Sequence, residues 1–135
     1  SQFYMIVYLL VTRCRQLDVS PEVIRSNRNL NRLSRITAYM KEHYDQNLSL
    51  TSLAETFGYS PNYLARMFHR YAHTTYKTYL QSLRLEYAHR ELSNSDLPIG
   101  EIASRHGFAS SKSFSHAFRE KYGVLPSEYR RLQKG

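Results

Sequence analysis

Apolar residues recur at helical spacing between Leu48 and Tyr71, and this stretch organises the rest of the chain. Its first half carries the apolar positions of one buried helical face, Leu50, Leu53, Ala54 and Phe57. Gly58 predicts the end of that helix, because the left-handed conformation that closes many helices costs glycine little. Ser60 and Pro61 predict a second helix, with a capping hydroxyl followed by proline at the first helical position. Helix, sharp turn and helix is the sequence form of a helix-turn-helix motif.

The second predicted helix has two contrasting sides. Its apolar side consists of Tyr63, Leu64, Met67, Phe68 and Tyr71. Its outward side is polar and basic, and it consists of Asn62, Ala65, Arg66, His69 and Arg70. We therefore expect the helix to be anchored on one side and free to bind a partner on the other.

A second stretch, Leu97 to Tyr122, repeats the first. Leu48, Leu50, Leu53, Ala54, Gly58 and Tyr59 return as Leu97, Ile99, Ile102, Ala103, Gly107 and Phe108. After one inserted residue in the turn, Leu64, Phe68 and Tyr79 return as Phe114, Phe118 and Tyr129. Because solenoids need at least three units, two copies indicate a duplicated helix-turn-helix rather than a repeat array.

The remaining segments also favour helices, and no segment shows strand alternation. We expect a helix over residues 2–17, a linker over 18–29 with at most one turn after Pro21, and a helix from Leu30 to Gln46. Thr74 and Thr75 precede a joining helix over 76–92, about 25 Å long at 1.5 Å per residue. Ser127 is expected to cap a last short helix that ends near Leu132.

The pattern thus predicts an all-α fold with two homeodomain-like three-helix lobes on a long central helix. The first motif covers about 48–71, the joining helix about 76–92 and the second motif about 97–122. Residues 1–29 are expected to be an N-terminal helix and linker from an upstream regulatory or dimerisation domain. Residues 30–135 are expected to form one domain that carries both motifs.

Charge favours a polyanionic partner. The 135 residues carry 19 Lys and Arg against 11 Asp and Glu, a formal net charge of +8. Residues 29–135 hold 15 of the basic and 9 of the acidic residues, which leaves +6 with the repeats. A basic surface with no partner is the plainer alternative.

The N-terminal segment and the single cysteine limit the cellular context. Because Cys14 is the single cysteine, the chain cannot form an internal disulfide or a multi-thiolate metal site. This composition fits a reducing cytoplasm. The apolar run Phe3–Val11 is too short to span a bilayer and lacks the features of a signal peptide. We expect no membrane contact and the C-terminal piece of a longer protein. We expect the Phe3–Val11 helix to pack either on an upstream domain or second subunit, or on this chain's own helices.

No constellation for catalysis or cofactor binding is present in the pattern. The six histidines are scattered, and the pair His69 and His73 lacks the further ligands that a metal site needs. The segment from Gly107 to Ser111 is not a nucleophile elbow, since that motif needs glycine two residues either side of serine. We expect neither an enzyme nor a cofactor.

Several dispersed motifs together resemble one family. The segment SDLPIGEIASRHGFASSKSFSHAFREKYGVLPSEYRR is similar to the C-terminal signature of the AraC/XylS regulators of bacterial transcription. The segments LSLTSLAETFGYSPNYLARMFHR and TYLQSLRLEYAHREL resemble the other half, so that the likeness covers about 33–132. The resemblance implies seven helices in two helix-turn-helix lobes, with recognition helices in two successive major-groove segments. It also implies double-stranded DNA and RNA polymerase as partners, an activator role and an upstream sensing or dimerisation domain.

The resemblance assigns expected roles position by position. The expected base contacts are Asn62, Ala65, Arg66, Ser111, Lys112, Ser115 and His116. Arg66 is the strongest of these, because a guanidinium can bond guanine O6 and N7 together. The expected phosphate contacts are His69, Arg70, Arg119 and Lys121. Short hydroxyls and a histidine read bases weakly, so we expect the second motif to contribute more through phosphates.

Two other classes of function stay open. One is a non-catalytic helical module that binds proteins, and the other is the DNA-binding part of a multidomain response regulator or repair protein. Affinity for DNA would fall steeply with salt, with a slope near −5 for about six neutralised phosphates. A protein-binding module would show a flat salt dependence.

Overall fold

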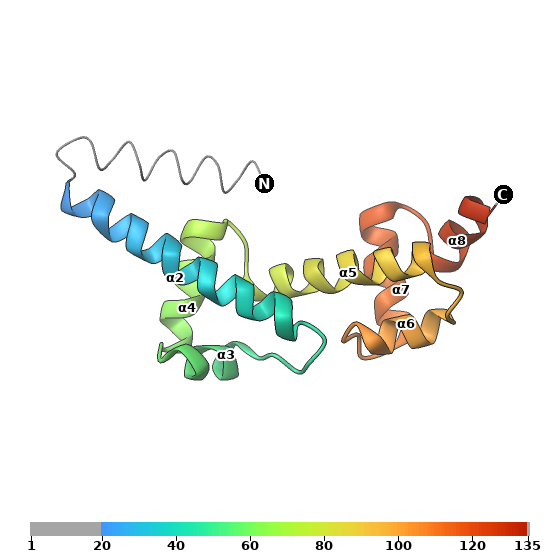
Figure 1. Ribbon diagram of the computed structural model, residues 1–135, viewed down its shortest axis with the longest axis horizontal. Helices are drawn as coiled ribbons and strands as arrows, with labels where there is room; N and C mark the ends of the chain where they lie inside the picture. Colours follow the sequence, from blue (N-terminus) through green and yellow to red (C-terminus); the bar gives the residue numbers. More distant parts are fainter. Residues whose placement is uncertain (1–19, 135) are drawn as a thin grey trace.

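The computed structural model describes residues 20–134 and shows two helical lobes on one shared helix (Figure 1). The first lobe contains α2 (Pro21–His43), α3 (Leu50–Phe57), α4 (Pro61–Met67) and a π-helical turn, η1 (Phe68–Ala72). Helix α5 (Tyr76–Asn94) joins it to the second lobe, which contains α6 (Ile99–Arg105), α7 (Ser111–Tyr122) and α8 (Pro126–Lys134). Within the described residues no strand occurs, so the predicted all-α fold with two lobes is confirmed.

Each lobe has its own apolar core. In the first lobe, α2, α3 and α4 bury side chains against one another, including Leu33, Ile36, Met40, Leu53, Leu64 and Phe68. In the second lobe, α6 and α7 pack on the C-terminal half of α5 through Ile102, Ala103, Phe114, Ala117 and Phe118. The apolar sides expected for both motifs are therefore the buried sides.

Helix α5 belongs to both cores because it buries two different sides. Leu80 and Leu83 lie in the first core, whereas Leu85, Ala88 and Leu92 lie in the second. The sequence predicts a single apolar stripe along this helix that omits Leu85. That stripe consists of Tyr76, Tyr79, Leu80, Leu83, Tyr87, Ala88 and Leu92. The 19 residues of α5 give it a length of about 28 Å.

The local stop and start signals work as the sequence predicts. Ser49 caps α3, and Gly58 ends it in the left-handed conformation with φ 75°. Ser60 accepts a hydrogen bond from the Tyr63 amide, with Pro61 at the first helical position of α4. Thr75 caps α5 in the same way. Such a cap typically stabilises a helix by about 1 kcal/mol.

Three expectations about element boundaries are wrong. The linker over 18–29 is helical from Pro21 onward, because Ser20 caps α2 and proline suits its first turn. That helix ends at His43 rather than Gln46. Ser127 does not cap the last helix, since α8 already starts at Pro126.

The expectations for residues 2–17, including the Phe3–Val11 helix and Cys14, lie outside the described residues. Over the described part of the chain, no helix is both long and apolar enough to cross a membrane.

Candidate nucleic-acid interface

The recognition helix of the first lobe is α4 continued by η1. Its inner side holds Leu64, Met67 and Phe68, which are at most 3% exposed. Its outer side presents the expected base-contact residues Asn62, Ala65 and Arg66, and all three are exposed. The structure therefore brings these side chains together on one open surface.

The expected phosphate-contact residues His69 and Arg70 continue this surface along η1, and both are exposed. The wider π-helical turn ends at His73, which adopts the left-handed conformation with φ 56°. The guanidinium of Arg70 lies 5.6 Å from the centre of the Tyr71 ring, within cation–π range. The helix from Pro61 to Ala72 carries no carboxylate, so the field at this surface is positive.

The recognition helix of the second lobe is α7. It starts with the same device as α4, because Ser110 caps it through the Ser113 amide. The expected contact residues Ser111, Lys112, His116, Arg119 and Lys121 are exposed, and Ser115 is half-buried. Lys112, His116 and Arg119 lie on the side away from Phe114 and Phe118. By helical spacing, Ser111 and Lys121 fall on the same side as these two rings, at the two ends of the helix.

Two contacts distinguish the surface of α7 from that of α4. The imidazole Nε2 of His116 lies 3.4 Å from Glu120 Oε1, so a carboxylate stands beside a predicted base contact. Ser111 lies close to α6, since a Cβ on Gly100 would lie 3.2 Å from its Oγ. The α7 surface therefore differs from the α4 surface by this carboxylate and by the closeness of its first residue to α6.

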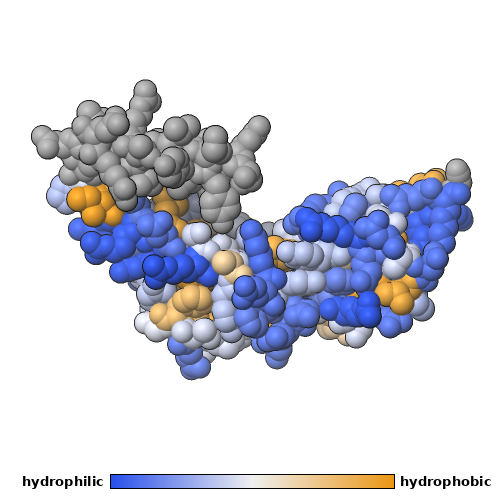
Figure 2. All heavy atoms as spheres, viewed as in Figure 1, coloured by the Kyte–Doolittle hydropathy of each residue, from blue (hydrophilic) through white to orange (hydrophobic). Residues whose placement is uncertain are grey.

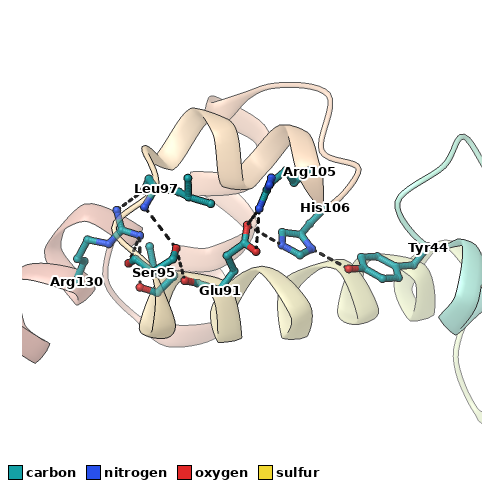
Figure 3. Close-up of polar contacts among 8 residues, drawn as sticks. Tyr44, Glu91, Ser95, Leu97, Arg105, His106 and Arg130 are labelled. Atoms are coloured by element: carbon teal, nitrogen blue, oxygen red, sulfur yellow. Dashed lines mark hydrogen bonds and ion pairs between the residues drawn. The ribbon is translucent and has the colours of Figure 1, made fainter.

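A set of polar contacts joins the two lobes directly (Figure 3). The Tyr44 hydroxyl, just beyond α2, bonds His106 Nδ1 at the end of α6 over 2.9 Å. His106 Nε2 faces Glu91 Oε1 of α5 at 3.5 Å. Arg84 of α5 donates through Nε to the Tyr44 carbonyl over 2.8 Å. We call these four residues, Tyr44, Arg84, Glu91 and His106, the interlobe contact.

Burial strengthens the interlobe contact. His106 is 9% exposed, and the Tyr44 ring stacks on Tyr87 with 4.5 Å between ring centres. Burial is the main cause that raises the pKa of the Tyr44 hydroxyl. The two recognition helices are thus positioned by α5 and by a direct bond between the lobes, Tyr44 to His106.

Gly107 makes this link possible. It has φ 85°, and a Cβ there would lie 2.7 Å from Arg84 Nε and 3.1 Å from the Tyr44 carbonyl oxygen. A side chain at this position would displace Arg84 from the turn of the second motif. Sequence reasoning assigned Gly107 to the turn alone and missed the interlobe contact. The one available signal was Leu85, an apolar residue outside the expected stripe of the joining helix.

The histidines of the described residues form no metal cluster. They contain no group of three or more His, Cys, Asp or Glu side chains that could hold a metal ion. His69 and His73, four positions apart, are both exposed near the end of η1.

Comparison with known proteins defines the class to which this chain belongs. Residues 53–132 match the family model described as a helix-turn-helix domain, which spans both motifs. The chain belongs to the AraC-type helix-turn-helix family, and it is a DNA-binding region of transcription regulators. The resemblance seen in the sequence is therefore confirmed.

Particular relatives sharpen this assignment. The chain is 39% identical over 95 residues to the regulatory protein SoxS of Escherichia coli, covering 70% of this chain and 89% of SoxS. It is 35% identical over 127 residues to the uncharacterised HTH-type regulator YijO of Escherichia coli, covering 94% of this chain but 44% of YijO. The chain thus spans less than half the length of that relative.

A solved structure of similar fold contains DNA. The DNA-binding domain of the global transcriptional factor AdpA, in complex with a target DNA, superposes with a TM-score of 0.72 at 27% identity. The match covers 76% of this chain and 92% of that domain.

Proposed function

We propose that this chain reads a bipartite operator, with α4 in one major-groove segment and α7 in the next on the same face of the duplex. The observation that carries the proposal is the outward surface of α4, where Asn62, Ala65 and Arg66 are exposed on a helix anchored by buried apolar residues. The same construction recurs in α7. Two such helices joined by helix α5 suit half-sites about one turn of the DNA double helix, 34 Å, apart.

The individual roles follow from side-chain chemistry. Arg66 is proposed to bond guanine through O6 and N7, Asn62 to bond adenine, and Ala65 to contact a thymine methyl. In the second lobe the proposed base contacts are Ser111, Lys112, Ser115 and His116. His69, Arg70, Arg119 and Lys121 are proposed to contact phosphates and so fix the register.

Separation of the two recognition helices is proposed to depend on α5 and the interlobe contact together. Helix α5 sets the distance, because its two sides are buried in the two cores. The Tyr44–His106 bond holds the lobes against rotation about that helix. A fixed phase between the helices lowers the entropy lost when both bind one duplex.

The cellular role is proposed by analogy with the named relatives, which are transcription regulators. We propose that the chain is non-enzymatic, uses no cofactor and acts in the bacterial cytoplasm as an activator in contact with RNA polymerase. Residues 1–29 are proposed to lead to an upstream regulatory or dimerisation domain, and residues 30–135 to form the DNA-binding domain. Since α2 passes through this boundary without a break, the two parts are joined by a helix.

Selection of bound duplexes from a random pool, followed by salt titration of the best site, tests this proposal. We expect a two-part site with half-sites about one turn apart and a log–log salt slope near −5 for about six neutralised phosphates. Enrichment of no sequence, or a flat salt dependence, would favour the protein-binding module instead.

A further inference from the structure

One side of α2 carries four arginines that neither helix-turn-helix motif includes. Arg25, Arg28, Arg32 and Arg35 are spaced three, four and three residues apart, which places them on one side of an α-helix. Arg25, Arg28 and Arg35 are exposed and Arg32 is half-buried. We call this set the arginine stripe.

The arginine stripe is fixed beside the first recognition helix by a polar network. Arg32 Nη1 donates to the Tyr63 hydroxyl over 3.2 Å. That hydroxyl donates to Asn29 Oδ1 over 3.2 Å. The amide nitrogen of Asn29 donates to the Tyr71 hydroxyl over 3.0 Å. The N-terminal half of α2 is therefore held against both α4 and η1.

An open groove of about 240 Å³ lies between these elements. Arg66 and Arg70 line it from the recognition helix, and Asn29 lines it from α2. The proposed base reader Arg66 and the proposed phosphate contact Arg70 thus adjoin the part of α2 that carries Arg25, Arg28 and Arg32. Positive side chains therefore lie both on the recognition helix and on the adjoining part of α2.

The charges of this surface are not neutralised within the described residues. None of the ion pairs there involves the arginine stripe, Arg66 or Arg70. The hydrophilic character of α2 on the viewed side is visible in Figure 2. Unpaired arginines on a rigid helix are positioned to bind an anion.

The direction of α2 decides where this surface lies. Its C-terminal end meets the second lobe, because Tyr44 directly follows it and bonds His106. Its N-terminal half therefore extends away from the second lobe, beyond the outer side of the first (Figure 1). A duplex that fills the surface of α4 would continue past this half of α2.

We propose that the arginine stripe binds DNA phosphates on the outer flank of the first half-site, beyond both recognition helices. The proposal rests on the proposed function, since it concerns the same bound duplex. Each added phosphate contact steepens the slope of log affinity against log salt concentration by about 0.9. Over the tenfold range from 1 M to 0.1 M salt, one contact therefore adds roughly 8-fold in affinity. These contacts add affinity without reading sequence.

Arg28→Ala and the double variant Arg25→Ala/Arg28→Ala, measured on the selected duplex, test the proposal. Lys41→Ala is the matched control, because it removes one exposed positive charge from the same helix about 140° round from Arg28 at 100° per residue. Alanine favours helix, so all three variants are expected to keep α2 intact by circular dichroism.

We expect Arg28→Ala to weaken binding roughly 8-fold at 0.1 M salt and to flatten the slope by about 0.9, with about 1.8 for the double variant. We expect Lys41→Ala to match the wild type, and all proteins to select the same sequence. Trimming the flank beside the first half-site should weaken binding by the wild type more than binding by the double variant, which keeps only Arg32 and Arg35 of the stripe.

Equal effects of Arg28→Ala and Lys41→Ala, or equal flank dependence of wild type and double variant, would overturn the arginine stripe as a DNA surface. An acidic protein would then be the alternative partner. If the wild type selects no DNA sequence, the proposed function fails. If it selects a sequence but the arginine variants bind like the Lys41→Ala control, only this inference fails.

Discussion

The two lobes share one scaffold, yet they present different chemistry at corresponding positions. Arg66 of α4 corresponds to His116 of α7, and only His116 lies near a carboxylate, Glu120 at 3.4 Å. The first lobe adds the arginine stripe along α2, whereas the second lobe is covered at its far end by α8. The two motifs thus share one backbone arrangement, whereas their exposed side chains differ in chemistry.

The glycines in the turns of the two motifs also have different surroundings. Gly58 and Gly107 both have positive φ, at 75° and 85°. A Cβ on Gly58 would meet nothing within 4 Å, whereas one on Gly107 would meet Arg84 and the Tyr44 carbonyl. One glycine serves its own turn, and the other also serves the contact between lobes.

The largest expected effect concerns the separate cores. Phe68→Ala and Phe118→Ala each remove a fully buried ring, which costs about 3–5 kcal/mol. We expect each variant to lower amide-exchange protection mainly in its own lobe. Equal loss of protection in both lobes would show that α5 couples the cores into one folding unit.

The second largest expected effect is a difference between the two lobes in how strongly their side chains read bases. We expect Arg66→Ala to cost about 1–3 kcal/mol on the selected site and to relax one base position, because a bidentate guanine contact is lost. His116→Ala should cost less than about 1 kcal/mol, since an exposed imidazole beside a carboxylate reads bases weakly. Titration of each variant with the selected duplex measures the loss of affinity. A larger loss for His116→Ala than for Arg66→Ala would contradict the prediction that the first lobe reads bases more strongly.

Alanine at the turn glycines should separate local from interlobe effects. Both Gly58→Ala and Gly107→Ala force a left-handed alanine, at about 1–2 kcal/mol of stability each. Only Gly107→Ala also displaces Arg84, so we expect it alone to broaden tolerance for altered half-site spacing. Thermal unfolding and binding to operators lengthened by one base pair give the two readouts, and identical spacing tolerance would contradict the interlobe role.

The smallest expected effect is a dependence on pH in the second lobe. Burial, with a smaller effect of Lys121, lowers the pKa of His89, whose Nε2 bonds the Tyr129 hydroxyl over 2.8 Å. The unfolded chain therefore binds the proton more readily, so this contribution to stability is present above pH about 6.5 and is lost as pH falls below it. We expect acid to lower the melting temperature of the second lobe, followed by its own NMR signals, and His89→Gln to reduce that dependence.

Much of the fold could be predicted because its signals are local. Ser60, Pro61 and Gly58 act on the backbone within a few residues, so their spacing is sufficient to place the turn and the start of α4. The expected linker was wrong because the weak helix preference of Ser26 and Asn27 is outweighed by the Ser20 cap and by Pro21 in the first turn. The outward position of Arg66 was predictable, because burial of Leu64 and Phe68 fixes the opposite side of the helix.

The sequence by itself determined the helices, the duplication and the side of each recognition helix that stays exposed, since these depend on residues near one another in the chain. Only the tertiary structure decided that Tyr44 meets His106 and that Asn29 and Arg32 of α2 meet Tyr63. These pairs are 62, 34 and 31 residues apart. Contacts over such separations arise from the packing of whole helices, which no local pattern records.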